Sequence, residues 1–304
     1  MENQNDRLLY HPLFPDRNAL GAKRSDDVRI WIERFLMPAG IVTEDEDRAN
    51  AYLVVGGDGT LMRKVCEKID KGKVFVGVNR GTVGFLLNPI DQINDIPLVK
   101  SQLNTFELRL IKVTFTTKEG EEKSFYAFND VICGGDIADY ISFKITGSLN
   151  HFPERSVSGN GIVIATPQGT TGFALKARGS SAILPLDSRN WYIAGVATGP
   201  YPCDQVSLQE ITIDLNSRFQ INGYADGRSQ TVNDIVRVIV NPTDKKATLG
   251  ILANIDFATR RTLLAQKVER GGDMSTSILL YQLSMTELAK SIAVKNNMIL
   301  GKVS

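Results

Sequence analysis

The stretch that decides the fold of this chain is Leu53-Val54-Val55-Gly56-Gly57-Asp58-Gly59-Thr60. Its apolar run ends at two glycines, and a helix-like segment over residues 61–69 follows the third glycine and the threonine. This order predicts a buried strand, a tight turn and a helix start. Glycines let the backbone approach a ligand closely, and the free N–H groups of a helix N-terminus attract phosphate. We therefore expect a phosphate-binding turn at this point.

Asp58 does not suit a turn that only binds an anion, because its carboxylate would repel phosphate. The residue fits the turn if it holds a metal or accepts a proton from the group that is being phosphorylated. The alternative is an ordinary strand-to-helix turn in which Asp58 is solvated, since short motifs often match by chance.

A second glycine loop follows the next predicted strand. Residues 52–55 and 73–78 predict two buried strands, and Asn79-Arg80-Gly81-Thr82-Val83-Gly84-Phe85 comes directly after the second. Strand, helix, strand and loop at this spacing predict an α/β unit with a parallel sheet. Ligands of such sheets bind beyond the carboxyl ends of the strands, so both glycine loops can face one site.

From about residue 99 the pattern changes to short alternating stretches, which are typical of antiparallel β structure. The stretches that predict strands are residues 107–115, 124–133, 141–145, 161–166, 191–196, 211–215 and 231–240, and turns are expected at residues 118–120, 222–223, 226–227 and 241–242. We expect an α/β phosphate-binding domain at residues 1–98, on which residues 263–304 pack back. Residues 99–262 should form a β domain with one short helix at residues 171–178.

Composition narrows the class of protein. The 304 residues are 42% hydrophobic and 23% charged with a net charge of +1, so no global field favours nucleic acid or an anionic membrane. No apolar run approaches the ~18 residues of a membrane-spanning helix, and residues 1–6 lack the features of a signal peptide. Three scattered cysteines are typical of reduced thiols, and we expect a cytoplasmic protein. Two histidines and no Cys/His cluster predict no metal site of the structural zinc type.

Two polar segments of the β domain are candidates for further chemistry. In Phe128-Asn129-Asp130-Val131-Ile132 an amide and a carboxylate lie side by side within an apolar strand. In Gly159-Asn160-Gly161-Ile162-Val163-Ile164-Ala165-Thr166-Pro167-Gln168-Gly169-Thr170-Thr171-Gly172-Phe173 a buried strand ends in Thr-Pro, and a polar glycine turn then opens a helix. Both could line a polar pocket. The alternatives are a solvated strand end and a helix start capped by Thr170 or Thr171.

Taken in order, these motifs resemble those of the NAD kinases. The resemblance runs from about Leu53 to Asp226 and rests on the two glycine loops, Asn129-Asp130 and Ala165-Thr166-Pro167-Gln168-Gly169-Thr170-Thr171. Gly-Gly-Asp-Gly alone is shared with phosphofructokinases and lipid kinases. The resemblance implies transfer of phosphate from ATP, or in some cases polyphosphate, to the 2′-hydroxyl of the adenosine ribose of NAD. It also implies an α/β domain, a β-sandwich domain, a substrate cleft between them, and a homodimer or homotetramer.

The resemblance further implies a role for each matching residue. Asp58 would activate the 2′-hydroxyl, Asn129 and Asp130 would bind the adenosine part of NAD, and Thr171 would lie on the adenine side. The other expected NAD-binding residues are Gly57, Gly59, Phe85, Asn160 and Phe173. The phosphates of ATP, which carry Mg²⁺, would be bound by Gly56, Gly57, Gly59, Thr60, Arg80, Gly81 and Asp226.

Four positions depart from the pattern of that family. Asp130 stands where a glutamate is usual, and Asn160 stands where an aspartate is frequent. Gln168 replaces a small residue, and Phe173 replaces a tyrosine, so the ring is kept and the hydroxyl is lost. An asparagine at position 160 can still bond a carboxamide but carries no charge.

Two other functions are consistent with the sequence. The first is a kinase of the same fold that acts on another hydroxyl, such as that of a nucleoside, a sugar phosphate or a lipid. A lipid substrate is disfavoured because the chain has no basic amphipathic helix. The second is a non-catalytic dinucleotide-binding regulator, and the intact Asp58 argues against it.

Overall fold

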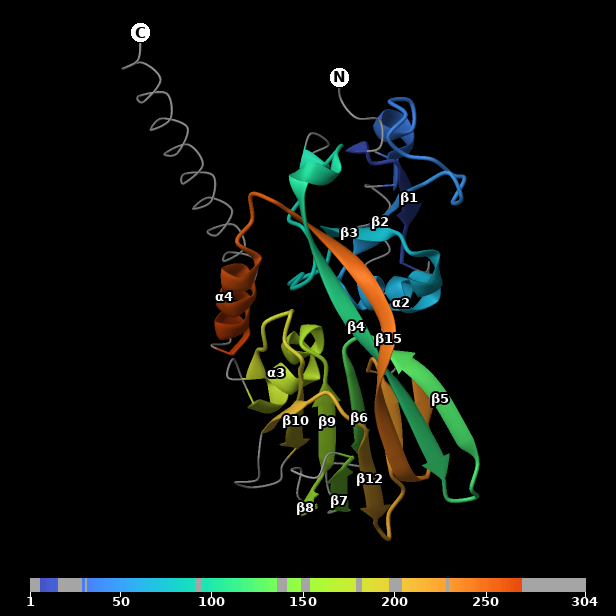
Figure 1. Cartoon of the computed structure of the whole chain (residues 1–304), viewed down its shortest axis with the longest axis vertical. Coiled ribbons are helices and arrows are strands. Elements are labelled where there is room, and N and C mark those ends of the chain that lie inside the picture. The colour runs from blue at the N-terminus through green and yellow to red at the C-terminus, as the bar shows by residue number, and fades with distance from the viewer. Residues whose placement is uncertain are drawn as a thin grey trace, which may run out of the picture.

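The structure is a computed structural model that describes residues 6–15, 29–30, 32–90, 95–135, 141–148, 154–178, 182–196, 204–227 and 230–269. The predicted return of residues 270–304 to the first domain lies outside these ranges. Within them, a nine-stranded mixed sheet and a six-stranded antiparallel sheet carry the fold. Figure 1 shows the α/β domain above and the β domain below. The predicted fold class, an α/β domain joined to a β-sandwich domain, is confirmed.

The mixed sheet has the order β1-β2-β3-β15-β12-β7-β8, and β4 pairs with β15 and β5. Its strands are β1 (Tyr10–Leu13), β2 (Ala51–Gly56), β3 (Val74–Asn79), β4 (Leu103–Thr117), β5 (Glu122–Ala127), β7 (Ile141–Gly147), β8 (Arg155–Gly159), β12 (Ile211–Asn216) and β15 (Ile235–Leu252). The neighbours β1, β2, β3 and β15 are parallel, and the other pairs are antiparallel.

The second sheet has the order β11-β10-β9-β6-β13-β14. Its strands are β6 (Asp130–Gly134), β9 (Gly161–Ala165), β10 (Asn190–Val196), β11 (Asp204–Ser207), β13 (Asn222–Ala225) and β14 (Gln230–Val232). The α-helices are α2 (Asp58–Lys68), α3 (Phe173–Arg178) and α4 (Phe257–Glu269), and shorter helical turns are η2 (Ile32–Leu36), η3 (Ile69–Lys71), η5 (Lys100–Gln102) and η6 (Gln168–Thr171). None of the described helices is long and apolar enough to cross a membrane.

A long ribbon of β4 and β15 passes through both domains (Figure 1). Along its other edge, β15 pairs with β12 in the sandwich and with β3 in the α/β domain. The turn predicted at residues 241–242 is wrong, because β15 continues through them with a β-bulge between Pro242 and Lys246. Pro242 pairs with Ile111 at the edge of this bulge, and proline within a sheet is found at bulges and on edge strands. The two domains are therefore joined by continuous hydrogen-bonded backbone.

The buried strand β2 separates two cores. Successive side chains point to opposite faces of a sheet, so Tyr52 and Val54 pack with α2 and α4, and Leu53 and Val55 pack on the other face with η2. A strand that is covered on both faces is apolar at every position. This explains the unbroken run of apolar residues that leads into the first glycine turn.

The sandwich core lies between the facing surfaces of the two sheets and contains Phe115, Phe143 and Trp191. Gly223, which was predicted to form a turn, lies within β13. A Cβ on Gly223 would lie 2.4 Å from Cε1 of Phe115, so glycine is needed there for close packing rather than for chain reversal. The turn at residues 226–227 is confirmed, with φ of 52° at Asp226 and 67° at Gly227.

The first strand, β1, begins at Tyr10, and Pro12 lies within it, which an edge strand tolerates. Two other local predictions need correction. The stretch 124–133 is two strands in different sheets, β5 and β6, because the chain bends at Phe128 and Asn129. The predicted helix at residues 171–178 begins at Phe173, after the turn η6.

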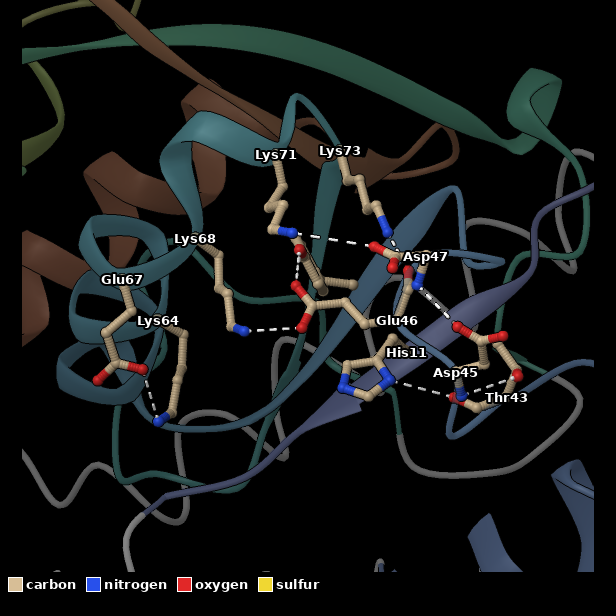
Figure 2. Close-up of polar contacts among 11 residues, drawn as sticks. His11, Thr43, Asp45, Glu46, Asp47, Lys64, Glu67, Lys68, Lys71 and Lys73 are labelled. Carbon is tan, nitrogen blue, oxygen red and sulfur yellow. Dashed lines mark hydrogen bonds and ion pairs between the residues drawn. The ribbon is translucent and has the colours of Figure 1, made fainter.

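A cluster of charged residues lies at the start of β2, which is the end of the strand opposite the glycine turn (Figure 2). The Glu46 carboxylate accepts the Tyr52 hydroxyl at 2.6 Å and the Lys68 ammonium at 2.8 Å, and the Glu46 carbonyl accepts Lys73 Nζ. The bonds from Lys68 and Tyr52 lower the pKa of Glu46 to about 2. The cluster ties β2 to the C-terminal end of α2.

Candidate active site

The two glycine loops lie against each other at the carboxyl ends of β2 and β3. The Arg80 N–H donates to the Gly56 carbonyl at 2.7 Å, and a Cβ on Gly81 would lie 2.9 Å from the Gly57 Cα. Side chains at these glycines would push the loops apart, so the glycines serve close approach of one backbone to the other. The two glycine loops therefore meet at the same edge of the sheet, as the α/β pattern predicts.

Asp58 is the first residue of α2, and its side chain crosses to the second loop. One carboxylate oxygen accepts the Phe85 N–H at 2.9 Å, and the other accepts the Leu86 N–H at 2.8 Å. A carboxylate has about four lone-pair positions, so Asp58 can still accept a hydrogen bond from a substrate hydroxyl. Asp58 therefore fixes the second loop and remains able to orient a ligand.

The electrostatic surroundings of Asp58 suit a proton acceptor. Burial of the carboxylate raises the pKa of Asp58 above its usual value, although the residue as a whole keeps some exposure. The N–H donors of Leu86 and Phe85 and the positive charge of Arg260 act in the opposite direction on this pKa. A raised pKa makes an aspartate a better base than it is in water.

The bend between β5 and β6 forms a second polar cluster, which we name the acceptor corner: Phe128, Asn129 and Asp130. Its backbone N–H groups donate to the carboxylate of Asp226, at 2.8 Å from Phe128, 2.6 Å from Asn129 and 3.4 Å from Asp130. The bend leaves these N–H groups without acceptors on a neighbouring strand, and the Asp226 carboxylate accepts their hydrogen bonds instead. Asp226 was expected among the phosphate-binding residues, and in the structure its carboxylate is engaged at the acceptor corner.

The loop at residues 166–171 packs directly against the acceptor corner. The Thr166 hydroxyl donates to the carbonyls of Phe128 and Asn129 at 2.8 and 2.9 Å. A Cβ on Gly169 would lie 1.9 Å from the Asn129 carbonyl oxygen, so the two backbones are in close contact. Gln168 is buried, and its amide nitrogen donates to the carbonyls of Arg109 and Phe128.

The polar side chains of Asn129 and Asp130 are both buried at the acceptor corner. The amide nitrogen of Asn129 contacts the Met62 sulfur, and its amide oxygen is buried with no partner. A buried polar atom without a partner costs about 1–3 kcal/mol, which is a reason to expect a ligand donor beside it. Burial, and then the charge of Asp226, raise the pKa of Asp130 to about 7, against the N–H donors of Phe173 and Gly227.

One face of α2 connects Asp58 to the acceptor corner. Asp58, Met62 and Cys66 are spaced four residues apart, so they lie on one side of the helix. Met62 contacts the Asn129 amide, and the Cys66 thiol lies 3.5 Å from an Asp226 carboxylate oxygen. Sequence reasoning missed Met62 and Cys66. The four-residue spacing from Asp58 was the signal that could have found them.

The remaining predicted residues divide between these two clusters. Thr60 lies beside Gly56, Arg80 donates to the Asn79 carbonyl, and Phe85 packs in the core below the glycine loops. Thr171 is buried in η6, with its hydroxyl donating to the Gln168 carbonyl. The Phe173 ring is exposed, and the Phe173 N–H donates to Asp130 at 3.4 Å.

Asn160 is not brought to the acceptor corner within one chain. It precedes β9, whereas Thr166 follows that strand, and five extended residues span roughly 17 Å. Its backbone N–H donates to the Val196 carbonyl, and its carbonyl accepts the Gly135 N–H. The structure therefore places two of the expected NAD-binding residues, Asn160 and Asp130, at opposite ends of β9.

Comparison with known proteins identifies proteins that are similar to this chain in sequence and proteins that are similar in fold. The NAD kinase of Aeromonas salmonicida is 35% identical over 211 residues, which cover 66% of this chain and 67% of the relative. The NAD kinase of Mesorhizobium japonicum is 34% identical over 143 residues, and this match spans about half of that relative, 54%. No family model matches the chain.

A solved structure has the same fold. The yeast NADH kinase complexed with NADH superposes with a TM-score of 0.64, covering 85% of this chain and 87% of that one. At 14% identity this likeness concerns the fold alone. The sequence identity to the Aeromonas salmonicida enzyme over two thirds of its length carries the assignment, and the chain belongs to the NAD kinase family.

Proposed function

We propose that the protein transfers a phosphoryl group from ATP to the 2′-hydroxyl of the adenosine ribose of NAD, giving NADP. The observation that carries the proposal is the shared face of α2. It joins Asp58, held between the glycine loops, to an acceptor corner with an unpartnered amide oxygen and a buried carboxylate. A kinase needs such an arrangement, because the hydroxyl that reacts must be oriented towards the phosphoryl donor.

In this mechanism the acceptor corner binds the adenosine. The Asn129 amide oxygen accepts a hydrogen bond from the ligand, and the Asp130 carboxylate accepts from a hydroxyl or an amino group. Thr171 and Phe173 lie beside the corner through η6 and the Phe173 N–H. These contacts form before the chemical step, so they contribute to binding rather than to turnover.

Asp58 acts on the 2′-hydroxyl. Its carboxylate accepts the hydroxyl proton as the ribose oxygen attacks the terminal phosphorus of ATP, and ADP leaves. The raised pKa of Asp58 favours this role, since burial makes its ionised form a stronger base. The bonds from Phe85 and Leu86 keep the carboxylate in a fixed orientation.

The glycine loops are the proposed binding site for the phosphates. Gly57, Gly59 and Gly81 present backbone to the ligand, and the N-terminus of α2 adds a favourable dipole for negative charge. The described ranges hold no group of three or more His, Cys, Asp or Glu side chains that could bind a metal. We therefore propose that Mg²⁺ arrives on the phosphates as part of the MgATP substrate, where it neutralises developing charge.

The resemblance also leads us to propose a cytoplasmic homodimer or homotetramer. Cys66 and Cys133 are free thiols, which suits a reducing compartment. Light scattering during size-exclusion chromatography measures the oligomeric state directly.

The activity is tested with a panel of acceptors and donors. Purified protein with MgATP should convert NAD, NADH or both to the 2′-phosphorylated product with equimolar release of ADP, and polyphosphate tests the alternative donor. ADP release with a nucleoside or sugar phosphate, but with neither NAD nor NADH, would assign the fold to another hydroxyl substrate. Specific NAD binding with no phosphorylation would instead indicate a regulator.

A further inference from the structure

Two adjacent arginines on α4 are buried beside the candidate active site. Arg260 and Arg261 are 4% and 3% exposed, and neither was singled out from the sequence. An arginine that is fully removed from water normally has a specific partner, because burying its charge is costly. We therefore ask which groups these two guanidinium groups serve.

Arg260 binds the second glycine loop. Its two terminal nitrogens donate to the Leu87 and Gly84 carbonyls, each at 2.8 Å. These carbonyls flank the N–H groups of Phe85 and Leu86, which bind the Asp58 carboxylate. Arg260 thus fixes the loop segment whose N–H groups bind the Asp58 carboxylate.

Arg261 binds the loop on the other side of the site. Its terminal nitrogens donate to the Leu184 and Pro167 carbonyls, both at 3.0 Å, and the second nitrogen also lies 3.5 Å from the Gln168 carbonyl. Residues 167–168 belong to the loop that packs on the acceptor corner. Successive residues of a helix point about 100° apart, so one helix can serve both loops.

Both arginines act electrostatically on the same carboxylate. The positive charge of Arg260 lowers the pKa of Asp58. Burial lowers the pKa of Arg261 to about 10, and the negative charge of Asp58 acts on that pKa in the opposite direction. Arg261 Nε is buried with no hydrogen-bond partner, so its charge is not fully satisfied by the loop carbonyls. Other ionisable groups around the site are Arg80 on the second glycine loop, Cys66 on α2, and Asp130 and Asp226 at the acceptor corner.

We propose that Arg260 and Arg261 are positioning residues that hold the phosphate-binding and acceptor-binding loops in one frame around Asp58 and keep its carboxylate ionised. The inference rests on the proposed function, because its predicted effects on kcat and on KM for NAD require NAD kinase activity. Arg260 acts through the loop that orients Asp58, so it governs turnover. Arg261 acts through the loop behind Asn129 and Asp130, so it governs acceptor binding.

Conservative variants separate charge from geometry. Lysine keeps the charge and loses the planar fork that binds two carbonyls, whereas glutamine keeps a donor and loses the charge. We expect Arg260→Lys to lower kcat about tenfold or more with little change in KM for NAD, and Arg261→Lys to raise KM for NAD several-fold with little change in kcat. Equal effects of the two lysine variants on both parameters, or changes confined to the melting temperature, would overturn the assignment.

The charge of each arginine is tested by titration of Asp58. The ¹³C signal of its carboxyl group, identified by its loss in Asp58→Asn, should titrate at a higher pH in Arg260→Gln and Arg261→Gln than in the unaltered protein. The lysine variants should titrate near the unaltered value. Arg109→Gln is the matched control, since Arg109 also binds a backbone carbonyl, that of Thr243, and is exposed in part. An unshifted Asp58 signal in both glutamine variants would refute the electrostatic role.

The two proposals can fail separately. A protein that phosphorylates neither NAD nor NADH would refute the proposed function, and the carboxyl titration would still test the arginines. If the glutamine variants do not fold, the lysine variants still test the inference. Asp58 should titrate near its normal pH in both, while Arg260→Lys changes mainly kcat and Arg261→Lys changes mainly KM. A lysine variant with a shifted titration and no kinetic split contradicts the inference.

Discussion

The carboxylate of Asp226 accepts the backbone N–H of Asn129 at 2.6 Å, across 97 residues of sequence. With the bonds from Phe128 and Asp130, it satisfies three consecutive donors at the point where the chain changes sheets. Asp226 itself has a φ of 52° in the turn that follows β13. The shape of the acceptor corner therefore depends on a residue in a distant turn.

Replacing Asp226 by alanine should loosen the acceptor corner. Three buried N–H groups would lose a charged acceptor, and each such loss costs on the order of 1–3 kcal/mol, part of which water can restore. We expect a clear fall in the melting temperature and a several-fold rise in KM for NAD. Asp214→Ala is the control, since its ion pair with Arg237 is partly exposed and contributes little. Equal behaviour of the two variants would contradict this role of Asp226.

Replacing Asp58 by asparagine should stop turnover and leave acceptor binding in place. The amide cannot take a proton, and general-base catalysis typically contributes 10²–10⁴-fold, so kcat should fall by at least about two orders of magnitude. One of the N–H groups of Phe85 and Leu86 also loses its acceptor, so a small loss of stability is expected. NAD affinity, measured by calorimetry, should remain close to that of the unaltered protein. Undiminished kcat in the folded variant would remove Asp58 from the mechanism.

The structure around the first glycine turn could be predicted from local sequence patterns. An apolar run that ends at Gly56 predicts a strand covered on both faces, and β2 is that strand. Neighbouring strands and loops in an α/β unit meet at one edge, so the contact between Gly57 and Gly81 could also be anticipated. These features depend on residues close together in sequence.

The features that could not be predicted depend on distant partners. The break at Asn129 requires the carboxylate of Asp226, and no local signal separates β5 from β6. Arg260 and Arg261 belong to a helix whose sequence is equally compatible with a solvated basic face, and only tertiary packing buries them. The separation of Asn160 from Asp130 likewise follows from the pairing of β9 with β6, which places Asp130 opposite Ala165 at the far end of β9.

Replacing Gly169 by alanine tests the contact between the 166–171 loop and the acceptor corner. A Cβ there would lie 1.9 Å from the Asn129 carbonyl oxygen, and both loops would have to move because neither atom belongs to a flexible side chain. We expect a large loss of stability and of NAD affinity. Gly59→Ala is the contrasting variant, since a Cβ at Gly59 meets nothing within 4 Å. It should fold normally while it weakens ATP binding, and a normal melting temperature of Gly169→Ala would disprove the contact.

Asp130 should make both substrate binding and stability depend on pH. Its pKa is about 7 in the folded protein, against an ordinary value of 3.8, so the folded state keeps a proton that the unfolded chain has already lost. The stability that this proton contributes is fully present below pH 3.8 and is lost as the pH rises through about 7. Binding should follow the opposite trend, because the ionised carboxylate is the stronger acceptor for a hydroxyl, and KM for NAD should fall as the pH rises through the same range.

Asp130→Asn separates these two effects. The amide cannot ionise, so the variant should avoid the cost of a buried charge and gain on the order of 4 kcal/mol at pH 8, with little gain at pH 4. The same variant should bind NAD more weakly at pH 8, since a neutral amide oxygen replaces a carboxylate, and its KM should lose the dependence on pH around 7. Chemical denaturation at the two pH values and initial rates across the range measure both predictions. A variant that is destabilised at pH 8 would mean that Asp130 is stabilised in its ionised form, and the link between its burial and acceptor binding would have to be abandoned.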